Sequence, residues 1–320
     1  MLTKQNVTAM LLGQAVGDAL GVPVEFSWRE ELKEDPVIGM REYGSWRQPA
    51  GTWSDDTSMA LAAMESLTRL KAVDYTDVCK NFVRWLEQDE FNANDETFDC
   101  GRTCGAAIRN FESGLSPDEC GLRDVMSNGN GSLMRIFPAV LYAHEKFSDE
   151  NAALEVVHKF SALTHAHHIS QTGCGIYYFI TAQILAGKTL NDAIYSGLND
   201  AKKFYESRAD FAEAAKAYSR LFDKNFASLK EYEIKSSSYV VETFEAVIWC
   251  LLNTNTYKNA LLKVVNLGRD TDTTGAIAGG LAGLFYGLEN IPADWLKVLR
   301  KRAYLKDMAE KFFKSLTSAG

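Results

Sequence analysis

The sequence predicts an all-α protein, a single compact multi-helix domain. Apolar residues recur three or four positions apart through most of the chain, which is the period of an amphipathic helix. No convincing series of alternating, strand-like segments interrupts this pattern. No low-complexity linker and no regular repeat of about 20 to 50 residues divides the chain. We therefore expect one domain over residues 1–320.

Seven segments show the helical period, and each is long enough for several turns. In chain order they are residues 55–70, 77–88, 151–167, 175–187, 239–252, 259–268 and 293–305. The first has the clearest start, because Ser54 is a natural N-cap and the acidic Asp55 and Asp56 suit the positive end of the helix dipole. Pro138 is expected to start or bend a further helix. The polar stretch 223–238 is expected to form a long surface loop.

Two segments carry glycine at every fourth position, which leaves each helix with a stripe that has no side chains. The glycines of the two stripes are Gly13, Gly17 and Gly21, and Gly275, Gly279, Gly283 and Gly287. Interior glycine costs roughly 1 kcal/mol relative to alanine, so close packing or function should offset it. Small residues in a crowded core would explain the stripes, but we expect the two helices to pack against each other or a shared neighbour. In an antiparallel pair, Glu25 would lie beside Asp270 and Asp272.

Charge and cysteine content narrow the class of protein. A formal net charge of -8 and a pI near 5.3 argue against a general binder of nucleic acid or anionic membranes, although a compact anion pocket is compatible with both values. The six cysteines form neither CxxC pairs nor a dense secreted framework, so reduced thiols are expected. Gln14 and Asp18 interrupt the apolar amino end and no convincing cleavage site follows, so we expect a cytoplasmic protein.

Two acidic helix starts are the main candidates for chemistry. Asp55 and Asp56 begin one helix, and Asp270 and Asp272 stand at the front of the second glycine-striped helix. Either start alone is an ordinary helix beginning. If the two meet, like charges about 4 Å apart repel by roughly 4 kcal/mol at an effective dielectric near 20, so the cluster requires cations or protons. A divalent metal satisfies this requirement.

The donor atoms of such a cluster indicate which metal it would take. The carboxylates and the hydroxyls of Ser54 and Thr273 are all oxygen ligands, which suits Mg²⁺ or Mn²⁺ over zinc. Two ions about 3.5 to 4 Å apart could share bridging carboxylates and position a water. His165, His167 and His168 are a weaker alternative, because they stand close together in "THAHHIS", and capping or exposure is expected for at least two of them.

An ordered set of motifs carries a family resemblance. The set comprises "GDALGVPVEF", "GTWSDDTSM", "FDCGRT", "NGNGSLMRIFP", "THAH" and "GRDTDTTGAIAGGLAG". Together these motifs resemble the ADP-ribosylglycohydrolase family over roughly residues 7 to 290. The resemblance implies an all-helical hydrolase with two Mg²⁺ or Mn²⁺ ions that removes ADP-ribose from a modified side chain. By the same resemblance the metal ligands are Ser54, Asp55, Asp56, Asp270, Asp272 and Thr273.

The resemblance also implies which residues act at the scissile bond. Glu25 matches a family glutamate that lies near the ribose, and we expect it to act as a general acid or base or to position the substrate. The alternative for Glu25 is a solvated residue after a proline turn. Asp99 matches the acid that faces the guanidinium in arginine-specific relatives, although it could instead cap a helix that begins near Gly101. Asp55 and Asp270 complete the expected catalytic set.

A second group of residues is expected to bind the rest of ADP-ribose. Close backbone approach at "SNGNGSLMR" and a helix starting near Ser132 suit a pyrophosphate, with Arg135 as a charge partner. Asn130, Gly131 and Ser132 are expected beside the phosphates or inner ribose, and the resemblance adds Gly101, Thr103 and His165. Trp53 or Tyr239 could stack on adenine, but core packing is the default for each. Arg269 stands where glycine is frequent in the family, and could reach a phosphate or block part of the cleft.

The expected function is metal-dependent removal of ADP-ribose from arginine side chains of modified proteins. One alternative is hydrolysis of O-linked or small-molecule ADP-ribosyl substrates by the same centre. A second alternative is an immunity protein that counteracts an ADP-ribosyltransferase toxin by reversal or by masking. The expected partners are an ADP-ribosylated protein substrate, the product ADP-ribose and, in the second alternative, a cognate ADP-ribosyltransferase. Neither nucleic acid nor a membrane is expected as a partner.

Overall fold

The computed structural model describes residues 2–317, and this part of the chain is helical without a strand, as the sequence predicts. The helices are α1 (Lys4–Gly21), α2 (Arg29–Glu34), α3 (Asp55–Leu70), α4 (Tyr75–Gln88), α5 (Arg102–Glu112), α6 (Pro117–Cys120), α7 (Phe137–Lys146), α8 (Glu150–Ala162), α9 (His168–Leu185), α10 (Leu190–Glu206), α11 (Ala212–Ala215), α12 (Val240–Leu252), α13 (Tyr257–Val265), α14 (Thr271–Tyr286), α15 (Ala293–Val298) and α16 (Arg302–Thr317). Short 3₁₀ turns cover Val22–Val24, Val125–Ser127, Lys216–Tyr218, Phe226–Ser228, Glu231–Glu233 and Leu288–Asn290.

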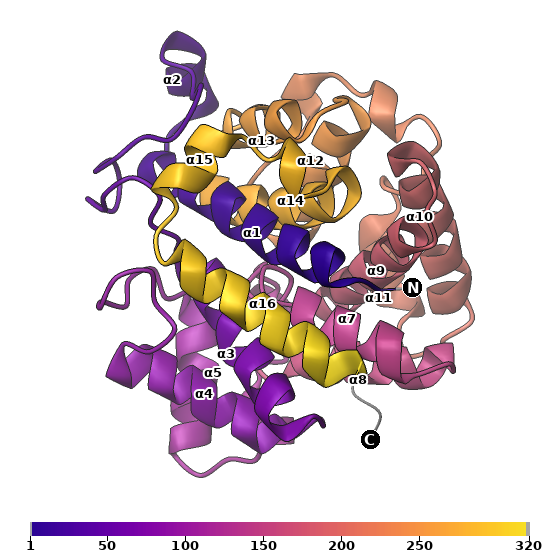
Figure 1. Ribbon diagram of the computed structural model, residues 1–320. Helices are drawn as coiled ribbons and strands as arrows, with labels where there is room; N and C mark the ends of the chain where they lie inside the picture. Colours follow the sequence, from indigo (N-terminus) through magenta and orange to yellow (C-terminus); the bar gives the residue numbers. More distant parts are fainter. Residues whose placement is uncertain (1, 318–320) are drawn as a thin grey trace.

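Helices α1 and α14 form the centre of the fold, although they come from opposite ends of the chain (Figure 1). Helix α16 packs on another side of α1, and α12 and α13 pack on α14. The remaining long helices surround this centre, with α3 and α4 on one side of it and α7 to α10 on the other. Almost every residue of α1 after Val7 is buried, because neighbours surround this helix. The start of α14 is therefore held deep in the protein.

The glycine stripes explain how closely the two central helices approach. A Cβ on Gly17 would lie 2.0 Å from the carbonyl oxygen of Gly275, and one on Gly13 would lie 2.3 Å from that of Gly279. A Cβ on Gly283 would lie 2.3 Å from the carbonyl oxygen of Ala9. The predicted packing of the two helices against each other is confirmed, and the paired positions run in opposite directions, so the pair is antiparallel. No side chain larger than glycine fits at these crossings without moving the backbone.

Three predicted helix boundaries are wrong by five residues or more. The helix expected from residue 175 begins at His168. The helix expected over 293–305 is broken after Val298, because the backbone of Arg300 donates to Gly51 and Lys301 takes a left-handed φ of 44°. The helix expected over 151–167 ends at Ala162, because the chain then pairs with Leu122 through two backbone hydrogen bonds. Both breaks arise from pairing with segments distant in sequence, which helical periodicity cannot reveal.

The chemistry of the core agrees with the expected reduced thiols, since all six cysteines are free. One helix of the described chain, covering Lys4–Val24, is long and apolar enough to span a membrane by length and composition. In the fold, however, 94% of its apolar window is buried, mainly against α14. The same apolar character is what a central core helix requires.

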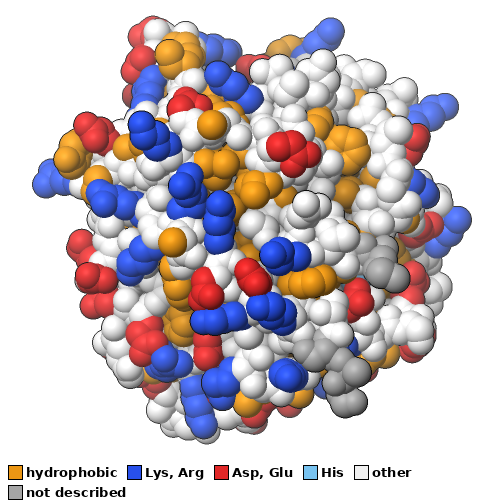
Figure 2. Space-filling view, in the orientation of Figure 1, with side chains coloured by type: hydrophobic (Ala, Val, Ile, Leu, Met, Phe, Trp, Pro, Cys, Tyr) orange, Lys and Arg blue, Asp and Glu red, His pale blue; other side chains and the backbone are white. Residues whose placement is uncertain are grey.

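The solvent-exposed face of α16 carries charged side chains that form ion pairs along the helix. Lys311 lies 2.7 Å from Asp307, and Lys314 lies 2.8 Å from Glu310. Figure 2 shows basic and acidic side chains interspersed over this face of the molecule. The opposite stripe of α16 includes Phe312 and packs into the core, so the helix covers α1 while presenting charge to water.

Candidate active site

The two acidic helix starts predicted from the sequence lie next to each other. Ser54 is the N-cap of α3, and its Oγ donates to Asp56 Oδ2 at 3.0 Å. Thr273 Oγ, in the first turn of α14, donates to the same carboxylate oxygen at 3.4 Å. A hydrogen bond therefore joins Thr273 to Asp56, 217 positions away in the chain. The crossing of α1 and α14 brings about this meeting, since it places the front of α14 beside the region where α3 begins.

Three further carboxylates converge at the same place. Glu25, Asp270 and Asp272 each bring one oxygen to within 4.8 Å of the others, and all three residues are buried. Glu25 follows the turn at the end of α1, and the indole Nε1 of Trp46 donates to its carboxylate. Ser45 Oγ holds the main chain of Glu25, donating to its carbonyl oxygen at 2.6 Å. The glutamate is therefore fixed from both its backbone and its side chain.

Burial and mutual repulsion disfavour the charged forms of these acids. Burial, followed by Asp99 and Asp270, raises the pKa of Glu25 to about 9. The pKa values of Asp55, Asp56 and Asp272 are raised well above their usual range, again chiefly by burial and then by neighbouring acids. Full ionisation of the cluster at neutral pH therefore requires added positive charge.

Two buried carboxylate oxygens without hydrogen-bond partners make the cluster suitable for a divalent metal. Asp56 Oδ1 and Asp272 Oδ2 are buried and have no hydrogen-bond partner, although their sister oxygens are satisfied. A buried carboxylate oxygen without a partner is costly unless a cation binds it. Every donor in the cluster is oxygen, which suits a hard cation. The cluster can accordingly hold a metal ion.

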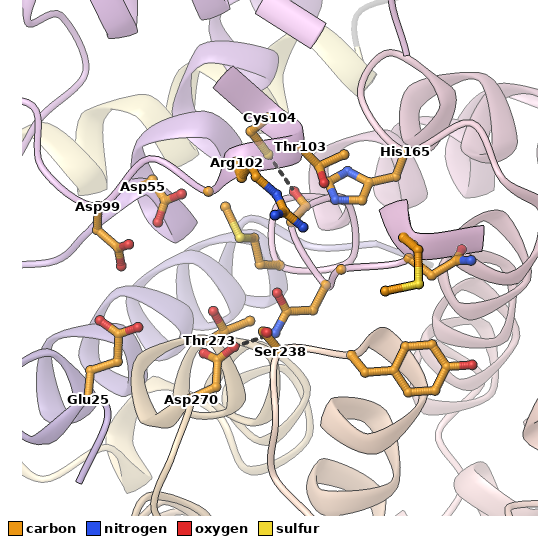
Figure 3. A pocket seen from close by; sticks show the side chains of 18 of the residues that line it. Glu25, Asp55, Asp99, Arg102, Thr103, Cys104, His165, Ser238, Asp270 and Thr273 are labelled. Carbon is orange, nitrogen blue, oxygen red and sulfur yellow. Dashed lines mark hydrogen bonds between the residues drawn. The ribbon is translucent and has the colours of Figure 1, made fainter. Parts of the chain in front are cut away.

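A cleft of about 630 Å³ opens over the cluster (Figure 3). Its acidic end carries the carboxylates of Glu25, Asp55, Asp99 and Asp270, and His165 lies toward the other end. The residues predicted for the site that line the cleft are Glu25, Asp55, Asp99, Gly101, Thr103, Asn130, Gly131, His165, Asp270 and Thr273. Ser54, Asp56 and Asp272 are buried in the acidic cluster and are not part of the cleft wall.

The loop with Asn130 and Gly131 connects the acidic end to the rest of the cleft. The side-chain amide of Asn130 donates to Asp270 Oδ2 and to Thr243 Oγ, each at 2.9 Å. A Cβ on Gly131 would lie 2.8 Å from Cys104 Sγ and 2.9 Å from His165 Cε1, so only glycine lets the loop approach this closely. Burial lowers the pKa of His165 to about 3, which keeps its imidazole neutral.

Comparison with known proteins identifies the family. A model of the ADP-ribosylglycohydrolase family matches residues 2–320. The chain belongs to this family of hydrolases. It is 30% identical over 308 residues to ADP-ribosylarginine hydrolase Tri1 of Serratia proteamaculans (strain 568), covering 95% of this chain and 77% of that protein. It is 32% identical over 292 residues to ADP-ribosyl-[dinitrogen reductase] glycohydrolase of Rhodospirillum rubrum, covering 90% and 88%.

More distant relatives and a solved structure agree with this assignment. The chain is 25% identical over 333 residues to ADP-ribosylhydrolase ARH3 of Homo sapiens, covering 89% of this chain and 85% of that protein. A solved structure described as an ADP-ribosylglycohydrolase-related protein complex superposes with a TM-score of 0.80 at 27% identity. That comparison covers 98% of this chain and 99% of the other, so the family similarity extends over the whole helical fold.

Three expectations about the binding end of this ADP-ribosylglycohydrolase need correction. No helix starts near Ser132, since α7 begins at Phe137, and the Ser132 hydroxyl bonds to Ser161 at 2.9 Å instead of facing the cleft. Arg135 is buried and donates to Phe160 and Thr164, so it is a core residue. In both cases the local turn directs the side chain inwards, which the glycine-rich spacing did not show.

Trp53 is also a core residue and not a wall of the cleft. It is fully buried, and its Nε1 donates to Arg300 at 3.3 Å. Tyr239, the other aromatic residue considered for adenine, does line the cleft and is 37% exposed. An isolated bridge between Tyr239 and Gly129 places it beside the glycine-rich loop.

Asp99 and Arg269 take backbone conformations that are unusual for residues with side chains. Asp99 has a φ of 54° and lines the cleft, and it does not cap α5, whose N-cap is Gly101 without a side-chain bond. Arg269 has a φ of 68°, so the turn before Asp270 does use positive φ without glycine. The guanidinium of Arg269 lies 4.2 Å from the ring centroid of Trp28, and Arg269 does not line the cleft.

Sequence reasoning missed two groups at this site. Arg102, the first residue of α5, lines the cleft, whereas Arg135 does not. Asp18 lies within α1 and is completely buried. Its carboxylate accepts from the backbone nitrogen of Ser54 at 2.8 Å, and from the nitrogen and hydroxyl of Thr57 at 3.1 and 2.6 Å. An acidic residue inside an apolar, glycine-striped helix was the signal that could have identified it.

We expect Asp18→Asn to weaken metal use more than it weakens the fold. The amide would direct a donor at one of the donors that now bind the carboxylate, which would shift the first turn of α3 with Ser54, Asp55 and Asp56. Loss of a group that holds metal ligands in place typically costs about 10 to 100-fold in affinity or activity. The measurement is the metal concentration for half-maximal hydrolysis, with Asp18→Glu as the charge-preserving comparison. Equal metal requirements for wild type and Asp18→Asn would contradict this role.

Proposed function

We propose that this chain hydrolyses the bond between ADP-ribose and an arginine side chain of a modified protein, and that it requires divalent metal. The supporting observation is the meeting of two acidic helix starts, with Glu25 and Asp99, at one end of a cleft large enough for a nucleotide-sized ligand. The acidic end suits a cationic leaving group. The rest of the cleft offers Arg102 and neutral polar groups, which suit the anionic pyrophosphate of ADP-ribose.

We infer that Ser54, Asp55, Asp56, Asp270, Asp272 and Thr273 would hold the metal, with two Mg²⁺ or Mn²⁺ ions as the expected content. When bound, the metal supplies positive charge that activates water and orients the ribose hydroxyls. The orphaned oxygens of Asp56 and Asp272 support this assignment, because neither has a partner in the protein. The same positive charge would keep the surrounding carboxylates ionised.

Glu25 and Asp99 are proposed to act at the two sides of the scissile bond. Glu25 is held by Trp46 with its carboxylate facing the cleft, so it can position the attacking water and accept its proton once nearby positive charge lowers its pKa from about 9. Burial raises the pKa of Asp99 only to about 6, so it is largely ionised at neutral pH. An ionised carboxylate can accept two parallel hydrogen bonds from guanidinium and hold the leaving group in line.

The remaining cleft residues are proposed to bind ADP-ribose. Arg102 at the start of α5 supplies charge for the pyrophosphate, and the adjacent Thr103 supplies a hydroxyl. Gly131 permits a close approach of the loop backbone, whereas the Asn130 amide is already bound to Asp270. Tyr239 and the neutral His165 offer flat surfaces near the far end.

Arginine linkage is favoured over other linkages by two observations. Asp99 provides a carboxylate that lines the acidic end, where a guanidinium would lie. Relatives at 30% identity are named for hydrolysis of ADP-ribosylarginine, whereas the ARH3 proteins are similar at only 25 to 27% identity. An ADP-ribosylated protein is accordingly the proposed substrate, ADP-ribose the product, and the cytoplasm the proposed location.

The proposal is tested by release of free ADP-ribose from arginine-linked and serine-linked peptides. We expect release from the arginine peptide in Mg²⁺ or Mn²⁺, little release from the serine peptide, and loss of activity after chelation that readdition of metal restores. Unchanged hydrolysis after thorough chelation would contradict metal dependence. Preference for the serine peptide would favour the O-linked alternative.

The immunity alternative has its own test. If the protein protects by masking a cognate ADP-ribosyltransferase, a catalytically inactive variant should protect as well as the wild type does. Full protection by a variant with Asp270 and Asp272 both changed to alanine would therefore support masking, and loss of protection would support reversal by hydrolysis.

A further inference from the structure

One exposed aromatic residue at the cleft has a conformation that core packing does not explain. Phe26 has a φ of 67°, which bulky side chains rarely adopt, and it is 59% exposed. It follows Glu25 directly and lines the cleft. An exposed apolar ring buries little surface, so the fold gains little from holding it in a strained backbone conformation.

Two backbone hydrogen bonds hold this strained turn in place. The backbone nitrogen of Phe26 donates to the carbonyl oxygen of Arg269 at 2.6 Å. The backbone nitrogen of Arg269 donates to the carbonyl oxygen of Ser27 at 2.8 Å. Arg269 itself has a φ of 68° and is anchored on Trp28. The segment that carries Glu25 and the segment that carries Asp270 are thus joined by their backbones. The position of Phe26 is tied directly to both sides of the acidic cluster.

The ring of Phe26 lies at the acidic end of the cleft. Its centroid is 6.0 Å from the ring of Trp46, whose indole nitrogen donates to Glu25. The ring centroids of Trp46 and Phe98 lie 5.6 Å apart, and Phe98 directly precedes Asp99. Three aromatic rings in succession therefore connect the Glu25 segment with the Asp99 segment, and Phe26 is the most exposed large apolar ring among them.

A planar cation is the group that this arrangement fits. Carboxylates bind guanidinium at its edge through parallel hydrogen bonds, whereas aromatic rings bind it through its face. Asp99 supplies an edge partner, and Phe26 supplies an exposed ring at the same end of the cleft.

We propose that the ring of Phe26 stacks on the guanidinium of the ADP-ribosylated arginine while Asp99 accepts its hydrogen bonds, so that Phe26 determines linkage specificity. This assignment rests on the proposed arginine hydrolase activity. The arrangement explains why an aromatic residue occupies a left-handed turn, since that turn is what presents the ring beside Glu25.

The test compares Phe26→Ala with a matched control in steady-state hydrolysis of an ADP-ribosylarginine peptide. Tyr43 is the control, because it has the same φ of 67° and the same exposed fraction of 59% but does not line the cleft. We expect Phe26→Ala to raise KM about five to tenfold, and Tyr43→Ala to change it less than about twofold. Affinity for ADP-ribose, which lacks the guanidinium, should stay within about twofold of wild type in both variants.

Two further variants separate ring stacking from simple apolar contact. Phe26→Tyr retains the aromatic face and should keep KM near the wild-type value, whereas Phe26→Leu should resemble Phe26→Ala. Full activity of Phe26→Leu or Phe26→Ala in an active wild-type background would overturn the assignment to Phe26 alone. Equal loss of ADP-ribose affinity in Phe26→Ala would also overturn it, because the effect would not depend on arginine. A wild-type enzyme that does not cleave the arginine peptide would overturn the proposed function and this inference together.

Discussion

Asp272→Asn is expected to reduce hydrolysis by more than about 100-fold. Loss of a residue that only positions a metal ligand already lowers activity by up to about 100-fold, and Asp272 is proposed to be a ligand itself. At the same time, the metal-free variant should be at least as stable as the wild type. Burial and the neighbouring acids raise the pKa of Asp272 well above its usual range, so the folded protein disfavours its charge. The amide has the same shape, carries no charge, and can still accept the hydrogen bond that Thr273 N donates at 2.9 Å.

Thermal unfolding with and without Mn²⁺ measures both parts of this expectation. The wild type should gain stability on adding metal, because a ligand that binds only the folded state stabilises it, and the variant should lose most of that gain. Asp294→Asn is the matched control, since Asp294 also lies in the first turn of a helix but is exposed. Wild-type activity in Asp272→Asn would exclude this carboxylate from the metal site.

Gly17→Ala is expected to lower the free energy of unfolding by about 3 kcal/mol or more, at the upper end of the usual cost of overpacking. The new methyl group would lie 2.0 Å from the carbonyl oxygen of Gly275, and a backbone atom cannot rotate away. Helices α1 and α14 would have to separate. Because α14 carries Asp272 and α1 leads into Glu25, separation should also raise the metal concentration needed for activity.

Urea unfolding of the metal-free protein gives the stability change, and metal titration of the activity gives the second effect. Gly39→Ala is the control, because a Cβ there would meet only Trp295 Nε1 at 3.5 Å, an ordinary contact. We expect its unfolding midpoint to stay close to that of the wild type. A similarly small effect of Gly17→Ala would mean that the close crossing of the two helices is not required.

The order and type of residues along the chain were enough for several conclusions. Helical periodicity predicts the all-α class, because the period of an apolar face is a local property of the chain. Glycine at every fourth position predicts the close helix pair, since only a missing side chain permits such an approach. Paired acidic residues before Thr57 and Thr273 identify the two helix starts that meet. Each of these features depends only on the spacing of residues close together in the sequence.

Only the tertiary structure decided which side chains face the cleft. Arg135 and Ser132 stand in a suitable motif but turn into the core, and Arg102 from another helix lines the cleft instead. Asp18 and Phe26 owe their places to partners far along the chain, at Ser54 and at Arg269. The direction of a side chain depends on backbone turns and on neighbours distant in sequence, and residue spacing contains neither.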